Sequence, residues 1–163
     1  MPVAHPGSVA LAAVAGAAVA GAACGGEPRC GPDQAMVERV IDGDTIVAGG
    51  ATIRYLLVDA PEISGEAGCY GSNAAKFNTD LVLGQNVQLT YEPACQDRFG
   101  RTLAYVTVAG QDVNRLLVER GYACVLHIPP DGDDRAAEFA AVEAAARAAR
   151  RGLWGACDPV PCK

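Results

Sequence analysis

Three short stretches of the chain combine charged side chains with residues that interrupt a regular strand. They are "IDGDT" at 41–45, "IRYLLVDAPE" at 53–62 and "DRFGR" at 97–101. Carboxylates such as those of Asp44, Asp59 and Glu62 can bind a hard cation or accept a proton. The planar forks of Arg54 and Arg101 can bind a phosphate or a carboxylate through two hydrogen bonds. Taken singly, each stretch is also compatible with a solvated turn.

The elements that must position these residues follow from apolar periodicity and turn residues. Strands are predicted at 36–48, 51–58, 86–92, 101–108 and 122–128, and helices at 72–83, 112–121 and 134–151. Ser72 and Asp112 are the predicted N-caps of the first two helices. Asp42-Gly43-Asp44 falls inside the first strand, where it predicts a bulge or a bend stabilised by Asp42. The order predicts the α+β class, mainly β: a five-stranded OB-fold barrel with three helices packed on it.

Composition limits the kind of partner. The chain has 163 residues, a formal net charge of -6, and only two lysines beside eleven arginines. General positive charge cannot therefore attract nucleic acid, and any such chemistry must depend on a local group of cations. A single domain with short appendages is expected from this length.

The N-terminal segment predicts export. Residues 8–23 are uncharged and mostly Ala, Val and Gly, so 1–23 is interpreted as a signal peptide and 24–36 as a tether. Cys24 follows small residues, as at a lipoprotein cleavage site, and is a candidate for lipidation and membrane anchoring. Six further cysteines remain, an even number that suits disulfides. Zinc is the alternative, but there is no Cys-x-x-Cys pair and the spacings are wide.

Six segments together resemble the staphylococcal nuclease (thermonuclease) family. They are "VIDGDTI", "IRYLLVDAPE", "YGSNAAKF", "DRFGRTLAYV", "VNRLLVERGYA" and "AARRGLW", in the family's order and spacing. The resemblance runs from Val37 to Trp154, within a domain placed at 37–157 and followed by a tail at 158–163. It implies an OB barrel with three helices and a calcium-dependent nuclease that cleaves DNA, RNA or both, and a monomer is expected.

The resemblance also implies roles for individual residues. Asp44 and Asp59 match the family's calcium-binding carboxylates, and Ala60 matches a residue that adds a carbonyl oxygen. Glu62 matches the acid assigned to the attacking water. The remaining two positions, Arg54 and Arg101, match the arginines that bind the scissile phosphate.

Several points stay open. The same fold also occurs in binding modules without catalysis, so a non-catalytic nucleic-acid- or protein-binding module is the alternative function. His127 and the Arg98-Phe99 pair depart from the family pattern at substrate subsites, and His127 is interpreted as a structural histidine or a phosphate contact. The disulfides suggested with the help of the family fold are Cys124–Cys157, Cys69–Cys95 and Cys30–Cys162.

Overall fold

The computed structural model describes residues 1–3, 30–63 and 68–162. Cys24 and the predicted signal peptide beyond residue 3 lie outside these ranges, so their roles stay predictions. Within the described part, no helix combines the length and apolar character needed to cross a membrane. The first strand begins at Gln34, so the last residues of the predicted tether belong to the folded domain.

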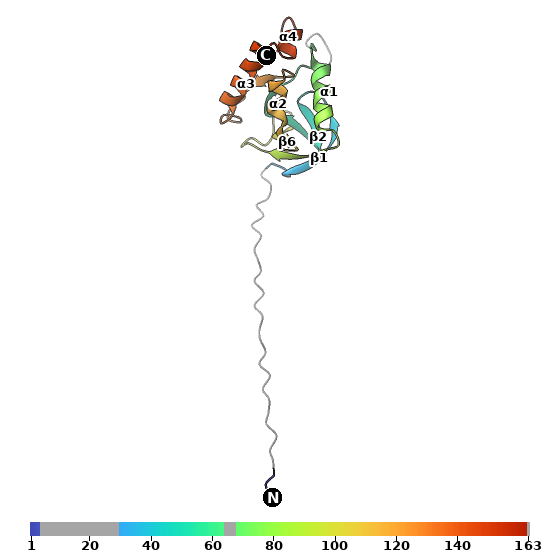
Figure 1. Ribbon diagram of the computed structural model, residues 1–163, viewed down its shortest axis with the longest axis vertical. Coiled ribbons are helices and arrows are strands. Elements are labelled where there is room, and N and C mark those ends of the chain that lie inside the picture. Colours follow the sequence, from blue (N-terminus) through green and yellow to red (C-terminus); the bar gives the residue numbers. More distant parts are fainter. Residues whose placement is uncertain (4–29, 64–67, 163) are drawn as a thin grey trace.

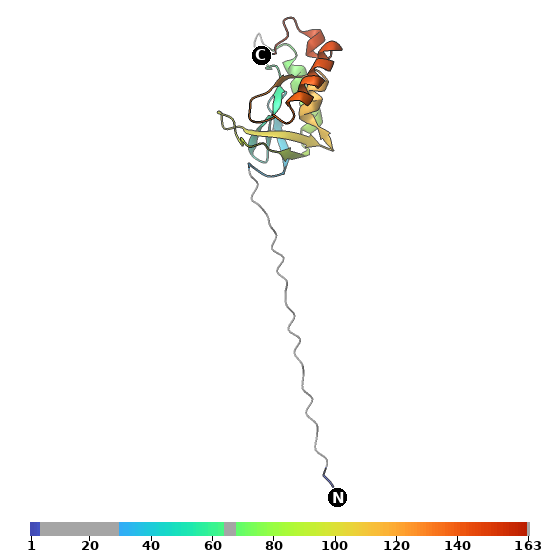
Figure 2. The ribbon, with the colours of Figure 1, turned by 90° about the vertical axis from the view of Figure 1, so that its left-hand side faces the viewer.

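Five strands form a closed barrel, as predicted. Their order is β3-β2-β1-β5-β6, and a parallel pairing of β3 with β6 closes the barrel, whereas the other pairs are antiparallel. The strands are β1 (Gln34–Val40), β2 (Thr45–Ala48), β3 (Ala51–Tyr55), β5 (Asn86–Thr90) and β6 (Thr102–Val108). The helices gather on one side of this barrel (Figure 1, Figure 2).

The segments that supply the barrel strands differ from the prediction. Segment 36–48 forms two antiparallel strands, β1 and β2, because Asp42-Gly43-Asp44 reverses the chain between them. The predicted fifth strand, 122–128, forms β8 (Cys124–Leu126), which pairs with β4 (Leu57–Asp59) in a separate two-stranded sheet. A φ of 61° at Leu57 turns the chain out of β3 into β4. The barrel thus has the predicted number of strands but a different set of them.

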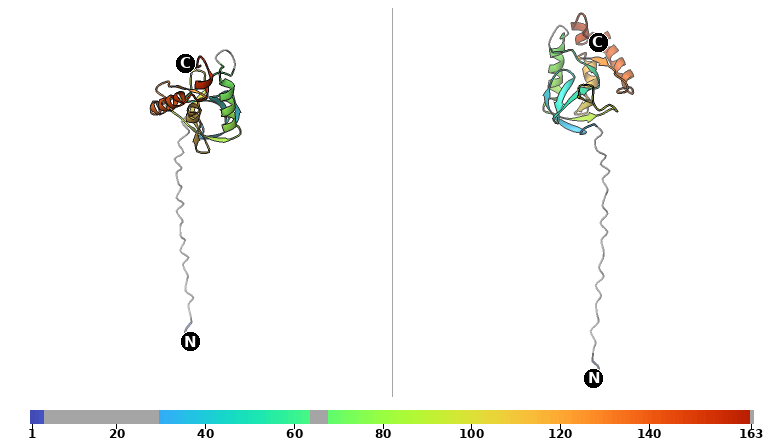
Figure 3. Two further views of the ribbon diagram at one scale, coloured as in Figure 1. Left: turned by 45° about the horizontal axis from the view of Figure 1, so that its top comes forward. Right: turned by 180° about the vertical axis from the view of Figure 1, so that it is seen from behind.

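Helices α1 to α3 correspond to the three predicted helices. Their bounds are α1 (Gly71–Val82), α2 (Val113–Glu119) and α3 (Ala136–Ala148), with α2 lying between the other two (Figure 1, Figure 3). Asp112, which ends the short strand β7 (Gln111–Asp112), caps α2 as predicted by accepting a hydrogen bond from the Arg115 amide. Ser72 is not a cap, because α1 begins directly after Tyr70 and no side chain caps it.

Two fully buried asparagines connect the helices to the strands near the charged residues. Asn78 of α1 donates to the Asp42 carbonyl oxygen (3.1 Å) and accepts from the Tyr55 hydroxyl (2.9 Å). Asn114 of α2 donates to the Leu56 carbonyl oxygen (2.9 Å). An unpaired buried amide costs about 1–3 kcal/mol, so these bonds strongly favour one placement of the helices on the barrel.

Three disulfides join the six cysteines of the described part, and the suggested pairings are wrong. The bonds are Cys30–Cys95, Cys69–Cys157 and Cys124–Cys162. The reason is a further helical turn, α4 (Leu153–Ala156), which carries Cys157 to the start of α1 beside Cys69. The tail beyond α4 then returns to β8, so Cys162 reaches Cys124 in place of Cys157.

Candidate active site

The turn between β1 and β2 carries Asp44 and is shaped by a neighbouring acid. The Asp42 side chain accepts a hydrogen bond from the Asp44 amide (3.0 Å), which agrees with its predicted role in stabilising a bend. A Cβ at Gly43 would lie 2.5 Å from the Cβ of Ala60 and 2.7 Å from that of Ala74. Glycine therefore allows the turn to lie against both the exit of β4 and helix α1.

Asp44 is buried, with 4% of the residue exposed. Its Oδ1 accepts from the Thr45 hydroxyl (2.9 Å), and its Oδ2 accepts from the Ala60 amide (2.6 Å). Burial raises the pKa of Asp44 to about 7, although Arg54 and the two hydrogen bonds act in the opposite direction. The ionised form of this carboxylate therefore depends on cations placed beside it.

Arg54 is the cation on which two of the acids converge. The β2–β3 register pairs it with Thr45, the residue after Asp44. Its Nη1 lies 3.0 Å from Asp44 Oδ2, and its Nη2 lies 3.2 Å from Asp59 Oδ1. Nη1 also donates to the Val58 carbonyl oxygen (2.6 Å). An unpaired buried charge is strongly destabilising. The contacts of Arg54 therefore stabilise the two acids beside it and also the β3–β4 connection.

Glu62 lies beyond the end of β4, where it is exposed and lines a cleft that it shares with the other predicted site residues. Pro61 precedes it and restricts the backbone at this point. Gly71, the first residue of α1, packs directly against it: a Cβ there would overlap the Glu62 carbonyl oxygen. The start of α1 therefore sets the backbone position of Glu62.

Arg101 is held by an acid on the opposite arm of a narrow hairpin, 96–102. Asp97 Oδ1 accepts from the amides of Phe99 (2.9 Å) and Arg101 (3.0 Å). Asp97 Oδ2 lies 2.7 Å from Arg101 Nε and 2.6 Å from its Nη2. Partial burial alone would raise the pKa of Asp97, but the hydrogen bonds from Arg101 and Phe99 lower it overall. Asp97 therefore orients the Arg101 side chain.

The six predicted site residues line a single cleft of about 780 Å³. They are Asp44, Arg54, Asp59, Ala60, Glu62 and Arg101. Exposed Phe99 and Ile128 also line the cleft, as does buried Asp131, which accepts from the Ala94 amide (3.1 Å). Asp131 was not predicted, because an acid in "PPDGDD" has the sequence signature of an ordinary turn.

The positions that depart from the family pattern, His127 and the Arg98-Phe99 pair, have different surroundings. His127 is exposed and absent from the cleft lining, and its Nε2 lies 2.8 Å from Asp133 Oδ1. Arg98 lines the cleft, with its guanidinium carbon 4.7 Å from the centre of the Phe99 ring. Arg98 is thus the additional cation available to a ligand in the cleft.

The donor set on this side of the cleft fits a hard divalent cation. Asp44 and Asp59 both place carboxylate oxygens beside the Arg54 guanidinium, and Ala60, whose amide donates to Asp44, lines the same cleft. Among the described residues, Cys124, Glu143 and Cys162 also place potential ligand atoms within 4.8 Å of one another. Those two sulfurs are joined in a disulfide, so that second group does not offer thiolate ligands.

Comparison with known proteins identifies the class to which this fold and site belong. The family described as "Staphylococcal nuclease homologue" matches residues 52–156, and the chain belongs to this family. Five of the six site residues fall inside the match, whereas Asp44 precedes it. The position of Asp44 in the site rests on its own contacts with Arg54 and Ala60.

Individual relatives carry nuclease names. The chain is 36% identical over 126 residues to "Endonuclease YncB" of Bacillus subtilis (strain 168), covering 72% of this chain and 60% of that protein. It is 34% identical over 137 residues to an "Uncharacterized endonuclease" of Escherichia coli O157:H7, covering 81% and 84%. It is 35% identical over 103 residues to "Thermonuclease" of Staphylococcus intermedius, covering 59% and 61%. The chain spans only 12% of "Endonuclease YhcR" of Bacillus subtilis.

Proposed function

We propose that this protein is a calcium-dependent nuclease that hydrolyses phosphodiester bonds in DNA, RNA or both. The observation that carries the proposal is the shared cleft, which is lined by two arginines and three acids of the types that phosphodiester cleavage uses. Family membership and the endonuclease names of the relatives support the same activity.

The side chains divide the work of hydrolysis between them. Asp44, Asp59 and the Ala60 carbonyl would hold a calcium ion, which when bound offsets negative charge on the phosphate oxygens. Arg54 and Arg101 add hydrogen-bond donors aimed at the same oxygens as charge builds on them. The Glu62 carboxylate accepts a proton from the attacking water, whose oxygen then bonds to phosphorus while the P–O bond to the leaving group breaks.

The disulfides support the proposal that the protein is exported. All six cysteines between 30 and 162 form disulfides, which suits an oxidising compartment. Their pairing leaves Cys24 available as a lipid acceptor, so the protein would act as a secreted enzyme or one anchored to a membrane through Cys24. A single chain supplies all six site residues, so a monomer suffices for activity.

The first experiment is digestion of single-stranded DNA and of RNA with calcium, with other divalent cations and with chelator. We expect cleavage that requires calcium, with a weak affinity of about 10⁻⁴ to 10⁻³ M typical of extracellular sites. Full activity in chelator would contradict the calcium requirement. Binding of DNA by the folded protein without any cleavage would support the non-catalytic alternative.

Glu62→Gln tests the role of the exposed acid in the cleft. The amide cannot take a proton, so we expect kcat to fall about 10²-fold or more while calcium affinity and thermal stability change little. Asp80→Asn is the matched control, because Asp80 is exposed and pairs with Lys76 on α1, outside the cleft. A large loss of calcium affinity in Glu62→Gln would make Glu62 a direct ligand.

A further inference from the structure

The hairpin that presents Arg101 has one arm fixed in the barrel and one arm outside it. Arg101 directly precedes β6, whose pairing with β3 begins at Thr102 opposite Ile53. Asp97 lies on the other arm, which leaves β5 after Thr90 and is not a barrel strand. The backbone of Arg101 is therefore fixed by the barrel, whereas the direction of its side chain depends on where the outer arm holds Asp97.

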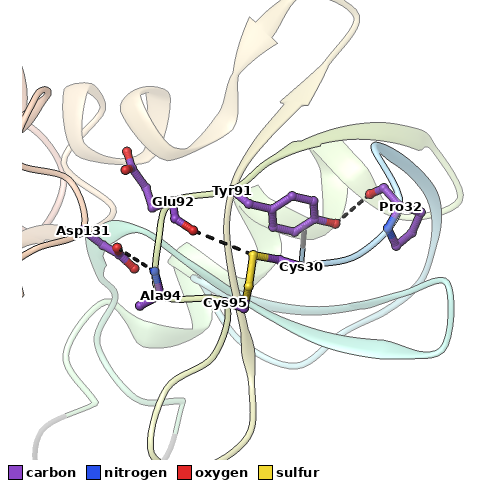
Figure 4. The surroundings of a disulfide bond; sticks show 7 residues. All are labelled: Cys30, Pro32, Tyr91, Glu92, Ala94, Cys95 and Asp131. Atoms are coloured by element: carbon purple, nitrogen blue, oxygen red, sulfur yellow. Dashed lines mark hydrogen bonds between the residues drawn. A yellow bond between two sulfur atoms is a disulfide. The ribbon is translucent and has the colours of Figure 1, made fainter. Parts of the chain in front are cut away.

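A disulfide attaches this outer arm to the segment before β1. Cys95, two residues before Asp97, is bonded to Cys30 (Figure 4). The Cys95 carbonyl oxygen accepts from the Leu103 amide (3.0 Å), so the bond is made at the base of the hairpin. Cys30 Sγ also lies 3.7 Å from the Glu92 carbonyl oxygen. The disulfide thus joins the arm at the point where it enters the hairpin.

Neighbouring contacts hold the same arm from both sides. The Tyr91 hydroxyl donates to the Pro32 carbonyl oxygen (2.6 Å), which places the segment before β1 along the arm. On the cleft side, Asp131 accepts from the Ala94 amide (3.1 Å), and Figure 4 shows this bond beside the disulfide. The outer arm is therefore clamped between the N-terminal segment and the loop that carries Asp131.

We propose that the Cys30–Cys95 disulfide is a positioning element of the active site. It fixes the arm that bears Asp97, and Asp97 in turn holds the Arg101 guanidinium at the cleft. The inference rests on the proposed nuclease function, because it assumes that Arg101 binds the scissile phosphate. The link also means that the segment before β1, which contains Cys30, is covalently joined to the wall of the active site.

The test compares two variants, each lacking one disulfide. Cys30→Ser with Cys95→Ser removes the proposed positioning bond, and Cys124→Ser with Cys162→Ser is the control at a bond outside the cleft. Their sequence separations, 65 and 38 residues, predict similar losses of stability. Below the unfolding temperature of both variants, we expect kcat to fall about ten-fold in the first variant and less than about two-fold in the control. Equal losses in the two variants would overturn the proposal.

Adding Arg101→Ala to each background shows whether the effect passes through Arg101. If the disulfide acts by positioning this side chain, Arg101→Ala lowers kcat much less in the Cys30/Cys95 variant than in the parent. In the Cys124/Cys162 control, Arg101→Ala should lower kcat as much as it does in the parent. Additive losses in the Cys30/Cys95 background would mean that the disulfide acts elsewhere, even if the protein is a nuclease.

Hydrogen exchange supplies a measurement that does not depend on activity. The amides of Phe99 and Arg101 donate to Asp97, so loss of the disulfide should speed their exchange while amides of β2 stay protected. Tyr91→Phe keeps every cysteine and removes only the hydrogen bond to the Pro32 carbonyl oxygen. This variant should increase the exchange rate of the same two amides, but to a smaller extent. Unchanged exchange at Phe99 and Arg101 in both variants would refute the positioning role whether or not cleavage is observed.

Discussion

Two arginines with the same proposed task differ in how the protein holds them. Arg54 is buried and satisfies two acids and the Val58 carbonyl oxygen, so it supports the fold as well as the site. The Arg101 side chain is 33% exposed and is held chiefly by Asp97. The same substitution should therefore have different consequences at the two positions.

Replacing either arginine with lysine tests this difference. A lysine keeps the charge but loses the planar fork, so Arg101→Lys should lower kcat/KM about 10²-fold and change the free energy of unfolding by less than about 0.5 kcal/mol. Arg54→Lys should lower activity as strongly and also destabilise by about 2 kcal/mol or more, because buried carbonyl and carboxylate oxygens lose donors. Kinetics and denaturant unfolding measure both effects. Equal stability losses in the two variants would contradict this division of roles.

The candidate site residues could be selected from the sequence because their motifs are local. Asp44, Arg54, Asp59, Glu62 and Arg101 each belong to a short pattern, and all of them line the cleft. The ion pairs among them were not predictable, because the contact of Arg54 with Asp44 depends on the register of β2 against β3. Asp131 was missed for the same reason: its partner amide, that of Ala94, is 37 residues away in the sequence.

At the scale of elements, the alternation of apolar and polar residues located the strands but did not show which strands pair with one another. The pattern of segment 36–48 predicts one strand, yet the bend at Gly43 divides it into two barrel strands. Segment 122–128 has the composition of a barrel strand, yet β8 pairs with β4 outside the barrel. Strand propensity reflects burial and pairing in general, so it cannot say which neighbour a strand will find.

The start of α1 offers a test at this scale, because two adjacent substitutions are expected to differ strongly in their effect on stability. Gly71→Ala should destabilise the protein by about 1–3 kcal/mol and lower activity, because the new methyl group pushes α1 away from the Glu62 backbone. Ser72→Ala is the control: its side chain does not cap α1, so it should change stability by less than about 0.5 kcal/mol. A loss of about 1 kcal/mol in Ser72→Ala would restore the N-cap interpretation.

At the scale of the molecule, the disulfides were the least predictable feature. Their pairing depends on α4, one helical turn that redirects the tail, and no periodic pattern marks so short an element. The three bonds join the N-terminal segment, the loop before α1 and the C-terminal tail to the rest of the domain. They therefore connect parts of the chain that the barrel strands leave unpaired.

Net charge poses a further problem for a protein that acts on nucleic acid. The whole chain carries -6, so attraction must come from cations at the cleft. Two acids, Asp44 and Asp59, offset the charge of Arg54, so its hydrogen bonds to a phosphate release little counterion. Arg98 and Arg101, the second of which has a single acidic partner, are then the guanidinium groups whose charge neutralises phosphates of a bound strand. A small number of effective cations predicts a weak dependence of binding on salt.

For single-stranded DNA, two neutralised phosphates give a slope of about -1.4 when log affinity is plotted against log salt concentration. Binding is best measured with Glu62→Gln, so that cleavage does not interfere. Adding Arg98→Ala should reduce the slope to about -0.7, since one phosphate contact is lost. Arg120→Ala should leave it unchanged, because Arg120 is exposed but lies outside this cleft. A slope near -4 in the parent would place the strand on a much wider basic surface than the cleft provides.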